Sequence, residues 1–121
     1  MVMLKDNHID YAGGIRPALE RTQQYLQAQG KPLRIEVETR NLDEVQQVLD
    51  VGGVDVIMLD NMSPEEMQQA VALIGQQYET EASGNINEDT IVAAAESGVD
   101  YISVGALTHS VKSLDMSLKA F

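Results

Sequence analysis

The chain has 121 residues, 44% of them hydrophobic, which is enough for one modest hydrophobic core. The net charge of −11 and the aromatic content of 4% argue against a nucleic-acid partner, because phosphate attraction and base-stacking platforms are both lacking. With no cysteine and no apolar run of about 18 residues, thiolate metal sites and a membrane-spanning helix are excluded, and we expect a cytoplasmic protein without membrane partners.

Strand-like and helix-like stretches alternate along the chain. Short strand-like runs occupy residues 2–5, 33–38, 56–60, 79–83 and 101–105. Between them, apolar residues three and four positions apart predict helices over residues 15–29, 42–51, 64–77 and 87–97. This alternation predicts an α/β fold with a parallel sheet, a TIM-barrel-like partial (β/α) barrel of about five βα units.

The ends of the predicted helices carry recognisable signals. Ser63 before Pro64, with Glu66 three residues on, predicts a capping box. Two asparagines are candidate N-caps and three glycines fall where helices should stop: Asn41, Asn87, Gly30, Gly52 and Gly98. Residues 53–59 (GVDVIML) resemble residues 98–104 (GVDYISV), which indicates a repeated unit of tight turn and strand.

Alternation within the strands divides their side chains into two sets. One set is apolar and should lie under the helices: Val2, Leu4, Leu33, Ile35, Val37, Ile57, Leu59, Ile102 and Val104. The other set should face the barrel lumen: Met3, Lys5, Arg34, Glu36, Glu38, Met58, Asp60, Glu79, Glu81, Ser83, Tyr101, Ser103 and Gly105. We expect this lumen to bring its charges together, where they must pair or bind something, because unpaired buried charges are costly.

Two loops have the composition of anion sites. The segment EASGNIN (81–87) places Ser83 and Gly84 between a strand and a helix whose first turn has free N–H groups. The segment VGALTHS (104–110) repeats this arrangement after the next strand, with Gly105 and His109. Phosphate sites after the last two strands are common in such barrels, so the two loops together favour a bound phosphate.

Two carboxylates end neighbouring strands on the inward side. Glu38 and Asp60 in this position suit Mg²⁺ held through water and substrate oxygens, or the stabilisation of positive charge on a sugar ring. The alternative is a structural ion pair with Lys5 or Arg34. Lys5 is itself a suitable point charge for a substrate carboxylate or phosphate. His8 could act as an acid–base group, although a lone loop histidine is more often a hydrogen-bonding residue.

Five motifs in this order resemble a known family. They are MLKDNHI (3–9), IEVET (35–39), IMLDN (57–61), EASGNI (81–86) and GVDYISVGALTHS (98–110). Together they resemble the C-terminal part of quinolinate phosphoribosyltransferase, also called nicotinate-nucleotide pyrophosphorylase (carboxylating). The resemblance implies an enzyme of NAD biosynthesis that combines quinolinate with 5-phosphoribosyl-1-pyrophosphate, with Mg²⁺, to give nicotinate mononucleotide, pyrophosphate and carbon dioxide.

The resemblance also implies roles for individual residues. Lys5 would contact a quinolinate carboxylate, while Glu38 and Asp60 would serve the ribose and Mg²⁺ end of the phosphoribosyl donor. The 5-phosphate would be held by Ser83, Gly84 and Gly105, with His109 near that pocket. Asn85 stands where the loop of the family commonly has a second glycine, and asparagine tolerates the left-handed backbone conformation.

Family members are much longer and have an N-terminal sandwich domain and opening barrel strands, so the resemblance implies that this chain is a partial barrel lacking both. We expect such a chain to form a homo-oligomer or to be marginally stable, and to be inactive by itself. Two alternatives stay open: a non-catalytic self-assembling module whose lumen charges pair with one another, and the molybdenum-transport-associated paralogue of the same superfamily.

Overall fold

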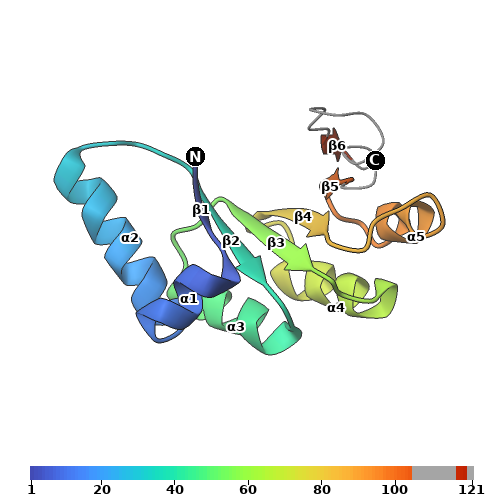
Figure 1. Cartoon of the computed structure of the whole chain (residues 1–121), viewed down its shortest axis with the longest axis horizontal. Helices are drawn as coiled ribbons and strands as arrows, with labels where there is room; N and C mark the ends of the chain where they lie inside the picture. The colour runs from blue at the N-terminus through green and yellow to red at the C-terminus, as the bar shows by residue number, and fades with distance from the viewer. Residues whose placement is uncertain (105–116, 120–121) are drawn as a thin grey trace.

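The computed structural model describes residues 1–104 and 117–119 (Figure 1). Its elements in chain order are β1 Val2–Leu4, α1 Asp6–Ala12, α2 Ile15–Gln29, β2 Ile35–Thr39, α3 Leu42–Val51, β3 Val56–Asp60, α4 Pro64–Ile74, β4 Glu79–Ser83, α5 Ile91–Glu96, β5 Tyr101–Ser103 and β6 Ser117–Lys119. Strands β1 to β5 are parallel neighbours in chain order. The predicted partial barrel of βα units is therefore confirmed.

Several predicted boundaries are also confirmed, and others need correction. The bounds of α2, α3, β3 and β4 agree with the prediction. Helix α4 ends at Ile74, before the predicted residue 77, because Gly75 leaves the helical conformation with φ 65°. Helix α5 begins only at Ile91 because the Asn87 side chain accepts the amides of Asp89 and Thr90 in a turn that precedes the helix.

The structure contains two elements that were not predicted from the sequence. Helix α1 follows β1 directly, and β6 pairs with β5 in the antiparallel sense. The expectation of an all-parallel sheet is therefore wrong at this edge. Neither α1 nor β6 has a long periodic pattern, and local sequence specifies such short elements weakly. Among the described residues, no helix is long and apolar enough to cross a bilayer.

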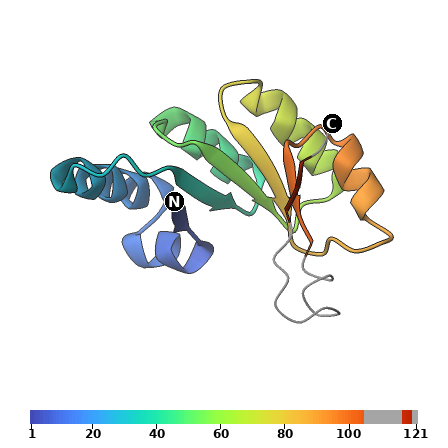
Figure 2. The ribbon, with the colours of Figure 1, turned by 90° about the horizontal axis from the view of Figure 1, so that it is seen from above.

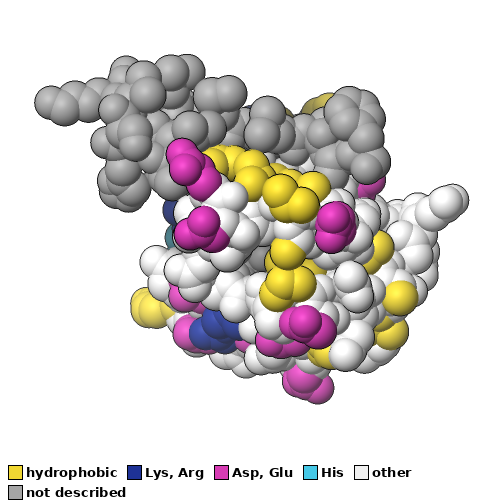
Figure 3. Space-filling model, turned by 90° about the vertical axis from the view of Figure 1, so that its right-hand side faces the viewer, with side chains coloured by type: hydrophobic (Ala, Val, Ile, Leu, Met, Phe, Trp, Pro, Cys, Tyr) yellow, Lys and Arg dark blue, Asp and Glu magenta, His cyan; other side chains and the backbone are white. Residues whose placement is uncertain are grey.

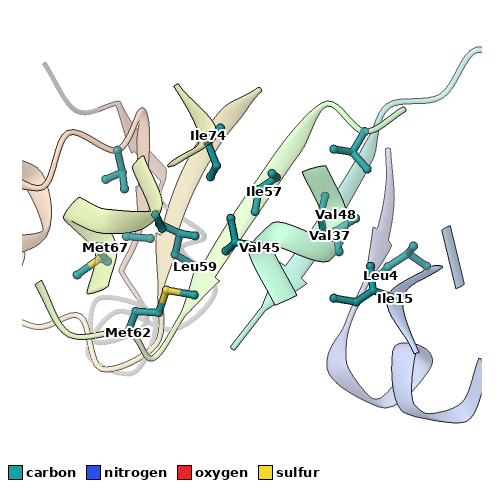
Figure 4. Packing of buried hydrophobic residues seen from close by; sticks show 14 of the residues in the cluster. Leu4, Ile15, Val37, Val45, Val48, Ile57, Leu59, Met62, Met67 and Ile74 are labelled. Atoms are coloured by element: carbon teal, nitrogen blue, oxygen red, sulfur yellow. The ribbon is translucent and has the colours of Figure 1, made fainter. Parts of the chain in front are cut away.

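Helices α3 and α4 cover one face of the sheet, as the alternation of side chains predicted (Figure 2). Figure 2 shows α3 and α4 on one side of the sheet and α1 on the other. Val37 of β2 and Ile57 of β3 are fully buried and lie beside Val45 and Val48 of α3 (Figure 4). Each such side chain contributes about 1.5–3 kcal/mol through burial. The opposite face of the sheet therefore carries the polar set.

The repeated Gly-Val-Asp segments have a structural role at the start of the strands. The Asp55 carboxylate accepts the amide of Ile35, the first residue of β2, at 2.8 Å. In the second copy, the Asp100 carboxylate accepts both the amide of Thr80, at 2.8 Å, and its hydroxyl, at 3.1 Å. Each aspartate thus ties the start of its own strand to the start of the preceding one.

We expect Asp100→Ala to lower the free energy of unfolding by about 1.5–3 kcal/mol, the usual contribution of hydrogen bonds to a charged group. The substitution leaves the amide of Thr80, which is only 2% exposed, without its carboxylate acceptor. Urea denaturation measures the change, and Asp89→Ala, at an exposed position, is the matched control. Equal losses in the two variants would contradict this role for Asp100.

Among the charged side chains on the described part of the surface in Figure 3, which shows the side of the molecule that carries α5, acidic ones predominate. Little lysine or arginine lies among them, in keeping with the net charge of −11. A phosphorylated ligand therefore needs hydrogen-bond donors concentrated at one place.

Candidate functional site

The carboxyl ends of β2, β3 and β4 lie together at one end of the strands, and the predicted site residues lie there. Asp60 is the last residue of β3 and pairs in register with Ser83, the last residue of β4. Glu38 is the last residue but one of β2. The amide of Asn61 donates to the Ser83 carbonyl at 2.9 Å, which ties the tips of β3 and β4 together.

Glu38 and Asp60 form a pair of facing carboxyl groups. Burial raises the pKa of Glu38, and its hydrogen-bonding contact with Asp60 raises it further. The amide of Asp6 opposes this shift because it donates to Glu38 Oε2 at 3.1 Å. Two carboxyl groups that disfavour each other's charge in this way are stabilised when a cation lies between them.

Lys5 lies at the same end of the strands, between β1 and α1. Lys5 is exposed and stands immediately before α1, whose first amide, that of Asp6, is bonded to Glu38. His8 accepts the Lys5 amide through Nδ1 at 3.3 Å, so it acts in the structure as a hydrogen-bonding residue of the first turn. Because α1 was not predicted from the sequence, neither was the hydrogen bond between Glu38 and the residue after Lys5.

The alternative of a structural ion pair is not found within residues 1–104. Arg34 pairs with Glu79 at 2.9 Å, and no ion pair joins Lys5 or Arg34 to Glu38 or Asp60 in this part of the chain. The carboxyl pair therefore has no cationic partner within residues 1–104.

The loop after β4 packs directly against this carboxyl pair. Gly84 has φ 76°, and a Cβ atom there would lie 2.8 Å from Asp60 Oδ1 and even closer to Asn61 Oδ1. Asn85 follows with φ 52°, so the asparagine at the position of the family's second glycine does adopt the left-handed conformation. The predicted anion loop and the predicted carboxylates are therefore parts of one site.

Asn61 belongs to this site but is not among the predicted site residues. It also has a positive φ, of 54°, and its side-chain amide donates to Asp60 Oδ2 at 3.2 Å. It thereby orients the carboxylate against Gly84. The signal in the sequence is an asparagine directly after a buried strand, with no glycine or proline beside it.

The other predicted residues have different outcomes. Gly105 and His109 lie outside the described residues. The expected gathering of the lumen charges is found in part, because Arg34, Glu36, Glu79 and Glu81 line one cavity whereas Glu38 and Asp60 form a separate pair. The charges lie at three levels, with Arg34–Glu79 near the start of the strands, Glu36–Glu81 in the middle and Glu38–Asp60 at the tips. Residues two apart on a strand share a face but lie about 6.6 Å apart, which separates the levels.

Arg40, at the end of β2, is a second residue that the sequence did not reveal. Its guanidinium group bonds Glu44 at 2.7 Å and Asp10 at 3.1 Å, which joins α1 to the first turn of α3. These carboxylates raise the pKa of Arg40, with Glu44 as the larger cause. Arg40 therefore holds α1 in place beside the site.

The fold and this geometry define a segment of an α/β barrel, with its candidate site at the carboxyl ends of the parallel strands. Residues 1–119 match the model of the family described as quinolinate phosphoribosyl transferase, C-terminal domain, and the chain belongs to that family. The predicted family resemblance is therefore confirmed.

Individual relatives agree with this assignment. The chain is 46% identical to quinolinate phosphoribosyltransferase (decarboxylating) 2b, mitochondrial, of Nicotiana tabacum, over 98% of this chain and 38% of that protein. It is 44% identical to a probable nicotinate-nucleotide pyrophosphorylase (carboxylating) of Methanocaldococcus jannaschii, over 97% of this chain and 42% of that protein. The crystal structure of the nicotinate-nucleotide pyrophosphorylase from Ehrlichia chaffeensis superposes with a TM-score of 0.82 at 38% identity, covering 94% of this chain and 40% of that one. The chain thus spans about two fifths of the length of these relatives.

Proposed function

We propose that this chain is the phosphoribosyl-donor half of an enzyme that transfers phosphoribosyl from 5-phosphoribosyl-1-pyrophosphate to quinolinate. Decarboxylation would then give nicotinate mononucleotide for NAD biosynthesis. The observation that carries the proposal is the packing of Gly84, in the loop after β4, against the Asp60 carboxylate. A donor with a 5-phosphate and a reactive ribose carbon needs both groups side by side.

Each part of the proposed site has a chemical role. The loop of Ser83, Gly84 and Asn85 would hold the 5-phosphate through backbone and hydroxyl donors, with Gly105 and His109 as predicted partners. The carboxylates of Glu38 and Asp60 would stabilise the positive charge that develops on the ribose ring as pyrophosphate leaves. Lys5 would bind a carboxylate of quinolinate.

Mg²⁺ is the proposed cofactor, held by Glu38 and Asp60. The facing carboxyl groups and the raised pKa of Glu38 support this choice, because a cation relieves their repulsion. No group of three or more metal-ligating side chains occurs among the described residues. Mg²⁺ is commonly bound through one or two carboxylates, water and substrate phosphates, and here it would neutralise the leaving pyrophosphate.

We further propose that the protein is a homo-oligomer and that the chain is inactive by itself. Within the described strands, β1 has an unpaired edge, and such edges favour pairing with another chain. A cytoplasmic location stays a prediction, since the printed name of the tobacco relative places that protein in mitochondria. Cell fractionation with an antibody against this chain would test it.

The same unpaired edge favours a second candidate function, a self-assembling module without ligand. The mass of the chain in solution, measured with and without the phosphoribosyl donor, separates the two. A discrete oligomer that binds no donor would favour assembly alone.

The test of the proposed function is calorimetric titration of the chain with 5-phosphoribosyl-1-pyrophosphate, with and without Mg²⁺. We expect millimolar binding that Mg²⁺ strengthens, and at least a tenfold loss in Ser83→Asp, because the new carboxylate repels the 5-phosphate. Asp43→Asn, at an exposed position on α3, is the control and should bind as the wild type does. Absence of binding at millimolar donor would overturn the proposal.

A further inference from the structure

A second carboxyl pair lies one level below the candidate site. Glu36 of β2 is 1% exposed and is in hydrogen-bonding contact with Glu81 of β4. The Ser103 hydroxyl of β5 donates to Glu81 Oε1. These contacts leave Glu36 Oε1 buried and without a hydrogen-bond partner among the described residues.

An unsatisfied buried acceptor of this kind destabilises the folded chain. Glu36 also lines a cavity of about 190 Å³, together with Glu81, Arg34, Glu79 and Tyr101. The cavity gives a ligand access to the neighbourhood of the orphan oxygen. The carboxyl groups of Glu36 and Glu81 at this cavity suit a group that donates hydrogen bonds.

The charges around the cavity specify the sign of that group. Glu36, Glu79 and Glu81 supply three carboxyl groups, whereas the lining residues that carry a positive charge are Arg34 and Met1, through its amino terminus. The guanidinium group of Arg34 is bonded to Glu79 at 2.9 Å. When Glu36 and Glu81 are both ionised, the three carboxylates outnumber these two positive charges.

The position of the pair in the barrel also favours a ligand that donates hydrogen bonds. A barrel lumen is filled by layers of four side chains from alternate strands. Glu36 and Glu81 come from alternate strands, β2 and β4, and interact across β3, with Glu81 two residues beyond the position in register with Glu36. The other side chains of such a layer would have to donate hydrogen bonds to the two carboxyl groups.

We propose that the Glu36–Glu81 pair binds a cationic N–H donor, namely a guanidinium or alkylammonium group. One N–H would satisfy Glu36 Oε1, and the positive charge would offset the acidic lining. Either a small molecule or the side chain of another polypeptide segment could supply this group. The site is separate from Glu38 and Asp60, so it goes beyond the proposed donor site.

The experiment is an NMR titration of the whole chain with methylguanidinium chloride at constant ionic strength, without phosphoribosyl donor or Mg²⁺. We expect saturable shifts of the amides of residues 36 and 81 in the millimolar range. Tetramethylammonium, which has charge but no N–H, should cause none. Equal shifts with both cations would overturn the proposal.

Variants test the two carboxyl groups separately. Glu36→Met removes the orphan acceptor and Glu81→Gln removes a charge, and each should weaken binding at least tenfold. Glu20→Gln, at a half-exposed carboxylate on α2, should have no effect. Arg34→Gln should bind at least as tightly as the wild type, because it removes a competing cation. Unchanged affinity in folded Glu36→Met or Glu81→Gln would contradict the proposal.

A titration with the blocked peptide Ala-Arg-Ala distinguishes a polypeptide side chain from a small molecule as the source of the cation. Binding at least tenfold tighter than that of methylguanidinium would assign the site to a polypeptide side chain, and equal binding to a small molecule. Because no donor is present, a failure here leaves the donor-binding test untouched.

Discussion

Gly84→Ala is expected to weaken binding of 5-phosphoribosyl-1-pyrophosphate at least tenfold and to lower the free energy of unfolding by about 1–3 kcal/mol. The stability loss arises because alanine is strained at φ 76°. The binding loss arises because the new methyl group would lie 2.8 Å from Asp60 Oδ1 and must displace that carboxylate. Calorimetric titration and urea denaturation measure the two effects.

Gly30→Ala is the matched control for this prediction. Gly30 ends α2 with φ 63°, and no atom lies within 4 Å of an added Cβ atom. It should therefore lose stability through backbone strain alone and leave donor binding unchanged. If both variants bound the donor as the wild type does, the role of the Gly84–Asp60 contact would be refuted.

The stability of the chain should depend on pH through Glu36. Burial, and secondly the contact with Glu81, raise the pKa of Glu36 to about 8, against 4.5 in the unfolded chain. Between these values the unfolded chain releases a proton that the folded chain keeps. The free energy of unfolding contributed by Glu36 is therefore fully present below pH 4.5 and falls toward pH 8, by up to about 1.4 kcal/mol per pH unit.

Glu36→Gln should flatten this dependence, because the amide has no proton to lose. Urea denaturation between pH 5 and about 8, without divalent metal, compares the variant with the wild type. The variant should gain relative stability as the pH rises, while Glu20→Gln should follow the wild type. Parallel curves for Glu36→Gln and the wild type would show that Glu36 does not retain its proton on folding.

The parts of the fold that sequence predicted are those set by local patterns. Helix α3 follows from its apolar spacing and from Asn41, whose side chain accepts the amide of Glu44 as an N-cap. The capping box of Ser63 and Glu66 is present as predicted. Helix α1 and strand β6 escaped prediction because each is short, and because β6 is defined by its pairing with β5.

The candidate site shows the same division. The sequence by itself determined that Glu38 and Asp60 end neighbouring strands on one face, because side chains alternate along a strand. Only the tertiary structure decided which carboxyl groups meet. Glu38 lies opposite Met58 in the register yet contacts Asp60, two residues further along β3. Glu36 is in register with Val56 and, through it, with Glu79, yet it contacts Glu81, two residues further along β4. This offset is the stagger of strands in a barrel, which depends on how the strands pack together and is not set by any one strand.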